Sequence, residues 1–150
     1  MKNNLSRNNK GFTLIELLVV IGILTILLSI VLIAINPSRQ FQQANNTQRR
    51  SDVSAILNAT HQYMADNNGT PPSAITNTAT NIGSGNTDID LCDDLVPTYI
   101  AEMPFDPIDG SYTSCASYDS GYEISKSSTD NRITVSAPSA ELSETISVTR

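Results

Sequence analysis

One carboxylate stands near the start of the longest apolar run of the chain. Glu16 is followed by residues 17–35, in which every side chain is apolar except Thr25 and Ser29. A carboxylate near the end of a membrane helix costs a few kcal/mol unless it is paired. Glu16 is therefore a functional candidate, and its partner should be a cation at a similar depth.

The residues before this run supply positive charge. Lys2, Arg7 and Lys10 all precede Gly11, and a cut after Gly11 would create one more cation, the amino group of Phe12. The alternative is that Glu16 lies at the membrane interface, where lipid head groups solvate its charge and no partner is needed.

The segment 12–35 is long enough to cross a membrane. As a helix it would reach about 36 Å, against a hydrocarbon core of about 30 Å. It is longer than the apolar part of a secretory signal peptide. The leader cations favour an N-terminus in the cytoplasm, although Arg39, Arg49 and Arg50 nearly balance them. We expect a single pass through the cytoplasmic membrane.

The residues Lys10-Gly11-Phe12-Thr13-Leu14-Ile15-Glu16-Leu17 resemble the class III signal of type IV prepilins and type II secretion pseudopilins. The resemblance covers about Lys10 to Ile35. It implies cleavage between Gly11 and Phe12 by prepilin peptidase and N-methylation of Phe12. It also implies a role for Glu16 in setting the assembly register, by pairing with the new amino group of a neighbouring subunit.

The same resemblance implies the partners and the final location of the chain. The subunit would leave the membrane for an extracytoplasmic filament of copies of itself and other pilins, at the cell surface or in the periplasm. A membrane platform protein and an assembly ATPase would drive that step. A pilus, a secretion pseudopilus and a DNA-uptake filament share this N-terminal chemistry, so the choice among them stays open.

Two simpler interpretations compete with the interpretation of the chain as a filament subunit. Gly11 is also an ordinary loop residue before a helix, and the helix alone could anchor a monomeric extracytoplasmic binding module. A mere anchor needs neither cleavage at Gly11-Phe12 nor the carboxylate of Glu16, so these residues favour the filament.

Composition argues against nucleic-acid binding and against enzymatic activity. The whole chain carries 9 basic and 15 acidic residues, and removing residues 1–11 with their three cations would leave 6 − 15 = −9. Such an acidic head lacks the basic patch that DNA binding requires. His61 is the only histidine, and no serine elbow, phosphate loop or zinc cluster accompanies it. We expect a structural protein.

The two cysteines, Cys92 and Cys115, fit no compact metal motif. A disulfide closing a loop of just over twenty residues would contribute about 3 kcal/mol and would place the head in an oxidising compartment outside the cytoplasm. A pair of unrelated free thiols is the alternative.

Patterning predicts an α+β fold. We expect a cleaved leader at 1–11, an apolar helix at 12–35, an amphipathic helix at 36–68 and a head at 69–150.

Pro37 should kink the helix. The amphipathic helix should present an apolar stripe, and a surface loop should occupy 70–90. Alternating segments at 111–118, 121–127, 131–137 and 143–149 predict an antiparallel sheet of three or four strands packed on that stripe. The stripe comprises Phe41, Ala44, Val53, Ile56, Leu57, Thr60, Tyr63 and Met64.

The segment Val96–Pro107 resembles a stretch of major pseudopilins that ends in a Pro-x-Asp-Pro turn. Some pseudopilins bind calcium after such a turn, so calcium is the one candidate cofactor, although the spacing matches no defined calcium loop. No metal site is predicted, and Asp90, Asp93 and Asp94 fit a solvated acidic loop better. The candidate oxygen ligands are Asp88, Asp90, Asp93, Asp94, Asp106, Asp109 and Asp119.

Overall fold

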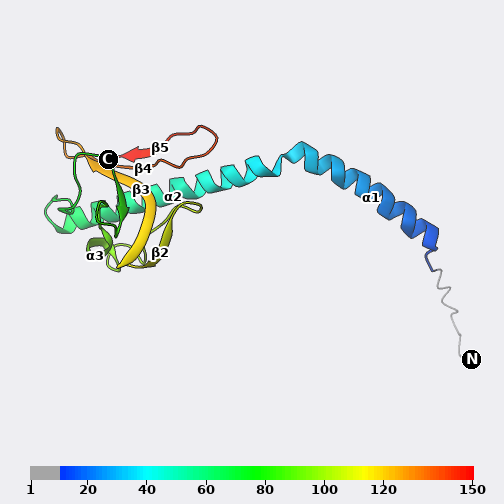
Figure 1. Ribbon diagram of the computed structural model, residues 1–150, viewed down its shortest axis with the longest axis horizontal. Coiled ribbons are helices and arrows are strands. Elements are labelled where there is room, and N and C mark those ends of the chain that lie inside the picture. The colour runs from blue at the N-terminus through cyan, green and yellow to red at the C-terminus, as the bar shows by residue number, and fades with distance from the viewer. Residues whose placement is uncertain (1–10) are drawn as a thin grey trace, which may run out of the picture. The chain divides into compact units, whose positions relative to one another are not determined.

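The computed structural model describes residues 11–150 (Figure 1), so the leader expected at 1–11 lies outside the described residues except for Gly11. The chain divides into two compact units, one up to Gln40 and one spanning Phe41–Arg150. The first contains helix α1 (Leu14–Ile35). The second contains most of helix α2 (Pro37–Asp66) and all of the sheet.

Helix α1 has 22 residues and ends where the sequence forbids its continuation. Asn36 follows it in the left-handed conformation, with a φ of 47°. Pro37 then opens α2, a position where its missing N–H leaves no backbone group unpaired. The structure therefore places the break in the helix at Asn36, directly before Pro37.

Helix α2 ends close to the predicted residue, but its buried stripe begins later than predicted. Asn68 and Gly69 have φ of 55° and 81° after the last turn, and the Gly69 N–H donates to the Met64 carbonyl at 2.7 Å. This left-handed cap stops the helix. Phe41 and Ala44 are exposed, which corrects the prediction that they pack on the sheet.

The remaining elements form a five-stranded antiparallel sheet and one short helix. The sheet order is β1-β3-β4-β5, with β2 also paired to β3. The sheet is larger than the three or four strands predicted, but the α+β class is confirmed. The elements are β1 (Thr80–Gly83), α3 (Cys92–Leu95), β2 (Ser111–Ser114), β3 (Ser117–Lys126), β4 (Ile133–Ala137) and β5 (Ile146–Thr149).

The core lies between α2 and one face of this sheet. Alternate residues of β3 and β4 point inward, as the sequence alternation predicts. Their side chains join the stripe of α2 in a single cluster. Its fully buried members include Val53, Ile56, Leu57, Tyr122, Ile124 and Val135.

Three predictions were wrong where strands meet loops. The loop expected at 70–90 contains β1, which pairs Thr80 with Ile124 although Ile82 is its only apolar residue. The segment 111–118, predicted as one strand, is a hairpin that turns between Ser114 and Ser117. The break predicted at 119–121 lies inside β3, where Gly121 takes a φ of 68° without interrupting the pairing with β4 further along.

The last predicted strand is shorter than expected. It begins at Ile146 rather than Ser143, because Leu142 and Ser143 both have left-handed backbones, with φ of 59° and 57°. The β4–β5 loop (residues 138–145) runs along α2 instead of extending the sheet (Figure 1).

Candidate functional site

The first turn of α1 is closed by a reciprocal capping box. Thr13 is the N-cap residue, and its Oγ1 accepts the Glu16 N–H at 3.3 Å. Glu16 Oε2 accepts the Thr13 N–H and the Thr13 hydroxyl, each at 2.8 Å. Two donors that the helix would otherwise leave unpaired are thereby satisfied. Thr13 and Glu16 therefore define where the helix begins.

This arrangement leaves Glu16 able to bind a cation. Both bonds from Thr13 go to Oε2, and a carboxylate has about four acceptor positions. Apolar atoms of Phe12, Ile15, Glu16, Val19 and Val20 line an open groove of about 360 Å³. An ammonium that reached this apolar groove would find one strong acceptor beside it, the Glu16 carboxylate.

Gly11 and Phe12 lie before the helix, in chain with no regular secondary structure. Both residues are exposed, and nothing lies within 4 Å of the position that a Cβ on Gly11 would occupy. Because both residues are exposed and lie outside the helix, the Gly11-Phe12 peptide bond is accessible to a peptidase. Cleavage and methylation at this bond remain predictions.

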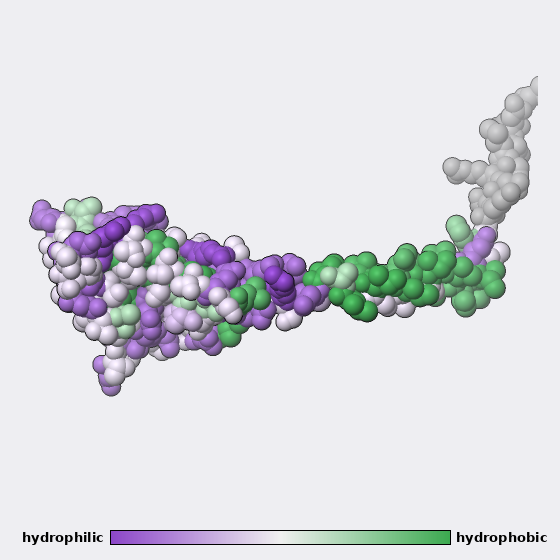
Figure 2. Space-filling view, turned by 90° about the horizontal axis from the view of Figure 1, so that it is seen from above, coloured by the Kyte–Doolittle hydropathy of each residue, from purple (hydrophilic) through white to green (hydrophobic). Residues whose placement is uncertain are grey.

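Helix α1 presents apolar side chains on all its sides. None of its residues is buried, and the face seen in Figure 2 is almost wholly hydrophobic. The Thr25 and Ser29 hydroxyls donate to carbonyls one turn back, at 2.7 and 2.9 Å, so they need no outside partner. By length and composition, α1 is the one helix in residues 11–150 that could span a membrane.

The second cluster of charged residues lies inside the unit Phe41–Arg150, which we call the head from here on. There Arg49 joins three segments. Its side chain is 1% exposed. Nε and Nη2 donate to both oxygens of Asp106, at 2.6 and 3.0 Å. Nη1 donates to Glu141 at 3.0 Å and to Asn46 at 3.1 Å. Arg49 therefore ties α2 to the turn around Asp106 and to the β4–β5 loop.

Asp106 also shapes the turn in which it lies. Its Oδ1 accepts the N–H groups of Ile108 and Asp109, at 2.9 and 3.1 Å. A Cβ on Gly110 would lie 2.5 Å from the Asp106 nitrogen, so the close approach requires glycine. The aspartate of the Pro-x-Asp-Pro segment is thus a buried partner of Arg49.

Sequence reasoning missed this network, although a signal was present. Asn46 and Arg49 continue the spacing of the buried stripe of α2 towards its N-terminus. Arg49 precedes Val53 by four residues, and Asn46 precedes Arg49 by three. A polar pair at core positions of a helix predicts buried polar partners elsewhere in the chain. The partners themselves lie 57 and 92 residues away from Arg49, beyond the reach of any local pattern.

Hydrogen bonding makes two of these carboxyl groups more acidic. Burial raises the pKa of Asp106, but the bonds from Arg49, Ile108 and Asp109 outweigh it and leave the pKa below its usual value. Bonds from Asn45 and then Arg49 likewise lower the pKa of Glu141. Burial has the opposite net effect on Asp52, whose pKa is raised despite bonds from Tyr122 and Gln48.

We therefore expect the head to lose stability in acid. A group whose pKa is lower when folded contributes stability above its unfolded pKa, near 4, and loses it as the pH falls through the folded value. Asp106 and Glu141 act in this direction, and Asp52 opposes them. Urea unfolding between pH 7 and pH 2.5 should show a falling free energy of unfolding below about pH 4. A flat profile would contradict this expectation, and Asp106→Asn should reduce the slope.

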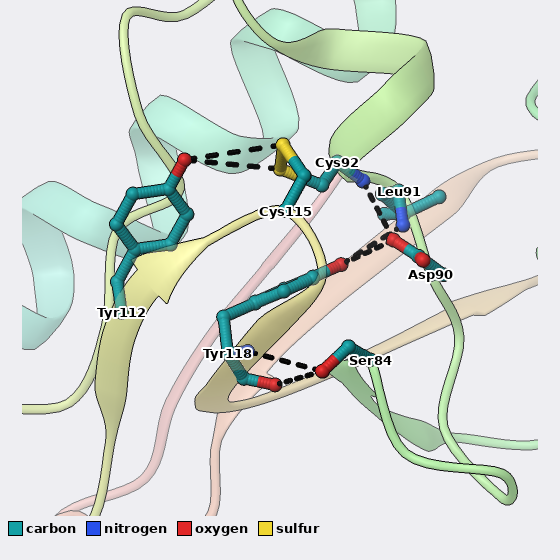
Figure 3. Close-up of a disulfide and its surroundings, with 7 residues drawn as sticks. All are labelled: Ser84, Asp90, Leu91, Cys92, Tyr112, Cys115 and Tyr118. Carbon is teal, nitrogen blue, oxygen red and sulfur yellow. Dashed lines mark hydrogen bonds between the residues drawn. A yellow bond between two sulfur atoms is a disulfide. The ribbon is translucent and has the colours of Figure 1, made fainter.

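The disulfide anchors the region around α3. Cys92 and Cys115 are bonded, with their Cα atoms 5.3 Å apart, so the predicted pairing is present in the structure. Figure 3 shows the Tyr112 hydroxyl beside both sulfur atoms, 4.0 and 3.9 Å away. Asp90 accepts the Tyr118 hydroxyl at 2.8 Å and the Cys92 N–H at 3.0 Å. The start of α3 is thus joined to the β2–β3 turn by a covalent bond and to β3 by the hydrogen bonds of the Tyr118 hydroxyl.

Removing this bond should destabilise the head. The double change Cys92→Ala and Cys115→Ala removes a crosslink between two residues that are 23 positions apart in the sequence. The expected loss is about 3 kcal/mol in the free energy of unfolding. Urea unfolding with and without a reductant measures it: the native protein should shift on reduction and the variant should not. Equal stability of the two oxidised proteins would show that the bond contributes nothing.

The candidate oxygen ligands for calcium are dispersed. Asp106 is bound to Arg49, Asp90 to Tyr118, and Asp119 to Asn81. In the part of the chain that the structure describes, no three His, Cys, Asp or Glu side chains gather as a metal site would require. His61 is partly buried on α2, and within residues 11–150 its Nε2 has no hydrogen-bond partner.

Comparison with known proteins agrees with the geometry at the start of α1. Residues 6–32 match the family model described as the prokaryotic N-terminal methylation motif. No curated protein and no solved structure matches the chain. The matched residues include the capping box, Glu16 and most of α1. The chain therefore carries at residues 6–32 the N-terminal methylation motif, which is the class III signal found in type IV pilins and pseudopilins.

Proposed function

We propose that the chain is a structural, non-enzymatic subunit of a type IV pilus-like or pseudopilus filament. It is made as a precursor anchored in the cytoplasmic membrane, cut between Gly11 and Phe12, methylated on Phe12 and assembled outside the cytoplasm through α1. The main support is a helix of 22 residues with no buried side chain, which begins at a capping box that holds the lone carboxylate of Glu16.

The proposed assembly uses the two ends of the segment from Phe12 to Glu16. Cleavage converts the Phe12 amide into an ammonium, a cation that can enter the groove beside Glu16 of a neighbouring copy. Phe12 precedes α1 and Glu16 lies in its first turn. Pairing between copies would therefore offset neighbouring helices along their axes, while the apolar surface of α1 is buried among other copies of α1.

Cleavage is tested by Gly11→Leu. A leucine at this position places a bulky side chain next to the scissile bond, and we expect only full-length precursor in the membrane fraction. Gly22→Leu is the matched control, because Gly22 also has nothing within 4 Å of its Cβ position but lies inside α1. That control should yield mature chain. Mature chain from Gly11→Leu would contradict cleavage at this bond.

A further inference from the structure

Three asparagines of the head stand two positions before a threonine, with a residue other than proline between them. They are Asn45, Asn58 and Asn68, in the sequences Asn-Asn-Thr, Asn-Ala-Thr and Asn-Gly-Thr. This spacing is the acceptor pattern for N-linked glycosylation, a modification of surface segments in proteins outside the cytoplasm. The folded head separates the three candidates by the accessibility of their side chains.

Asn58 lies inside α2, where helix geometry prevents access to the whole pattern. A helix turns by about 100° per residue, so side chains two positions apart point to nearly opposite sides. Asn58 is exposed, but Thr60 is fully buried, and its hydroxyl donates to the Ile56 carbonyl at 2.9 Å. An enzyme that must bind both the asparagine and the threonine cannot reach them here while the helix is formed.

Asn45 also lies inside α2, and its side chain is already engaged. Its Nδ2, the nitrogen that would carry a sugar, donates to Glu141 at 2.9 Å. The Thr47 hydroxyl donates to the Gln43 carbonyl one turn back, at 2.8 Å. Asn45 is half-buried, so its amide holds the β4–β5 loop against α2 and is not presented to an enzyme.

Asn68 lies beyond the end of α2, in a tight turn. Asn68 and Gly69 have φ of 55° and 81°, and the Thr70 N–H donates to the Asn67 carbonyl at 3.0 Å. Asn68 and Gly69 thus occupy the two central positions of the turn. Asparagine and glycine adopt this left-handed backbone with the least strain, so the acceptor sequence itself suits the turn.

The turn is accessible and has room for a bulky group. Asn68, Gly69 and Thr70 are all exposed, and nothing lies within 4 Å of the position that a Cβ on Gly69 would occupy. Of the three acceptor sequences, this one alone lies outside a helix with both its asparagine and its threonine exposed.

A carboxylate next to the turn is a second difference from the other two sequences. Asp66 is exposed and stands two positions before Asn68, whereas a glutamine and an isoleucine stand two positions before Asn45 and Asn58. The Oδ2 of Asp66 accepts the Tyr99 hydroxyl at 3.0 Å, and a carboxylate has further acceptor positions. Asp66 therefore offers a transferase one charged group to bind beside the acceptor.

We propose that Asn68 is a site of N-linked glycosylation. The Asn68 amide nitrogen forms a C–N bond to the anomeric carbon of an oligosaccharide, which a lipid diphosphate donor supplies. The bond from that carbon to the diphosphate breaks, and one amide proton passes to a base of the transferase. The inference goes beyond the proposed filament function and shares with it only a head outside the cytoplasm, which agrees with the disulfide between Cys92 and Cys115.

A sugar on Asn68 is compatible with packing through α1. The head begins at Phe41, and α2 continues from there to Asp66. At a rise of about 1.5 Å per residue, the end of α2 lies about 38 Å from Phe41. The sugar is therefore far, along α2, from the point where the head is connected to the unit that contains α1.

Peptide mass mapping of the mature chain, purified from the membranes and filaments of its own host, tests the site. Cleavage before aspartates separates the three candidates, because Asn45 falls before Asp52, Asn58 in residues 52–65 and Asn68 in residues 66–87. The 66–87 peptide alone should carry the mass of an added sugar. An unmodified 66–87 peptide, conversion of Asn68 to aspartate without sugar, or sugar confined to the other peptides would overturn the proposal.

Variants of the turn identify the atom that carries the sugar. Asn68→Gln and Thr70→Ala should each abolish the added mass, whereas Thr70→Ser, which keeps a hydroxyl, should retain it. Asn58→Gln is the matched control, because it changes an exposed asparagine of the same pattern, and it should also retain the added mass. Sugar that persists in Asn68→Gln is attached to another residue and would overturn the site.

Filament yield from the same cells keeps the two proposals apart. Filaments whose subunits lack sugar on Asn68 would overturn the glycosylation site and leave the proposed function standing. Sugar on Asn68 of a chain that never forms filaments would support the site and contradict the proposed function.

Discussion

Arg49→Met should lower the free energy of unfolding of the head by about 3–5 kcal/mol. The change leaves Asp106, which is fully buried, without the cation that compensates its charge. It also removes one of the bonds that hold Glu141 against α2. Urea unfolding of the mature chain in detergent, followed by tyrosine fluorescence because the chain has no tryptophan, gives the measurement.

The neighbouring residue provides the control for Arg49. Arg50 pairs with Glu144 at the surface and is 54% exposed, so Arg50→Met should cost less than about 1 kcal/mol. Adding Asp106→Asn to Arg49→Met removes the unpaired charge and should restore part of the loss. A cost for Arg49→Met as small as that for Arg50→Met would show that the buried network does not stabilise the head.

Glu16→Ala should abolish filaments while leaving the mature subunit intact in the membrane. The peptide bond after Gly11 is unchanged, so cleavage should proceed. Without the carboxylate, however, the ammonium of Phe12 has no acceptor in the apolar groove of a neighbour. Immunoblots of membrane and shed fractions separate the two steps, processing and incorporation.

Glu16→Gln distinguishes charge from capping. Glutamine retains an oxygen that can accept the Thr13 N–H, as Glu16 does in the capping box, but it carries no charge for an ammonium. It should therefore behave like Glu16→Ala in assembly and like the native chain at the start of α1. Filaments of normal abundance from Glu16→Gln would contradict a role of the charge in assembly.

Much of the fold was predictable because its signals are local. The apolar run after Glu16, the break at Asn36-Pro37 and the alternation in β3 and β4 each follow from neighbouring residues alone. The missed features depend on tertiary contacts. Strand β1 has one apolar residue and forms because β3 offers a partner edge, and the start of β5 is set by backbone angles at Leu142 that no propensity predicts.

The functional residues likewise fall into those that the sequence could indicate and those that it could not. Glu16 could be singled out from composition, since a lone charge in an apolar helix is costly, and its bonds to Thr13 fit the spacing of a capping box. The partners of Arg49 could not be predicted, because Asp106 and Glu141 come from distant segments that meet only in the folded head. The segment resemblance around Pro104–Pro107 drew attention to Asp106 only as one of seven candidate oxygen ligands, and nothing in it indicated an ion pair with Arg49.

The N-terminal mass spectrum of the shed filament subunit tests the central claim most directly. We predict that its first residue is N-methylated Phe12. A subunit beginning at Met1, or at any residue inside α1, would contradict processing at Gly11-Phe12 and the assembly mechanism built on it.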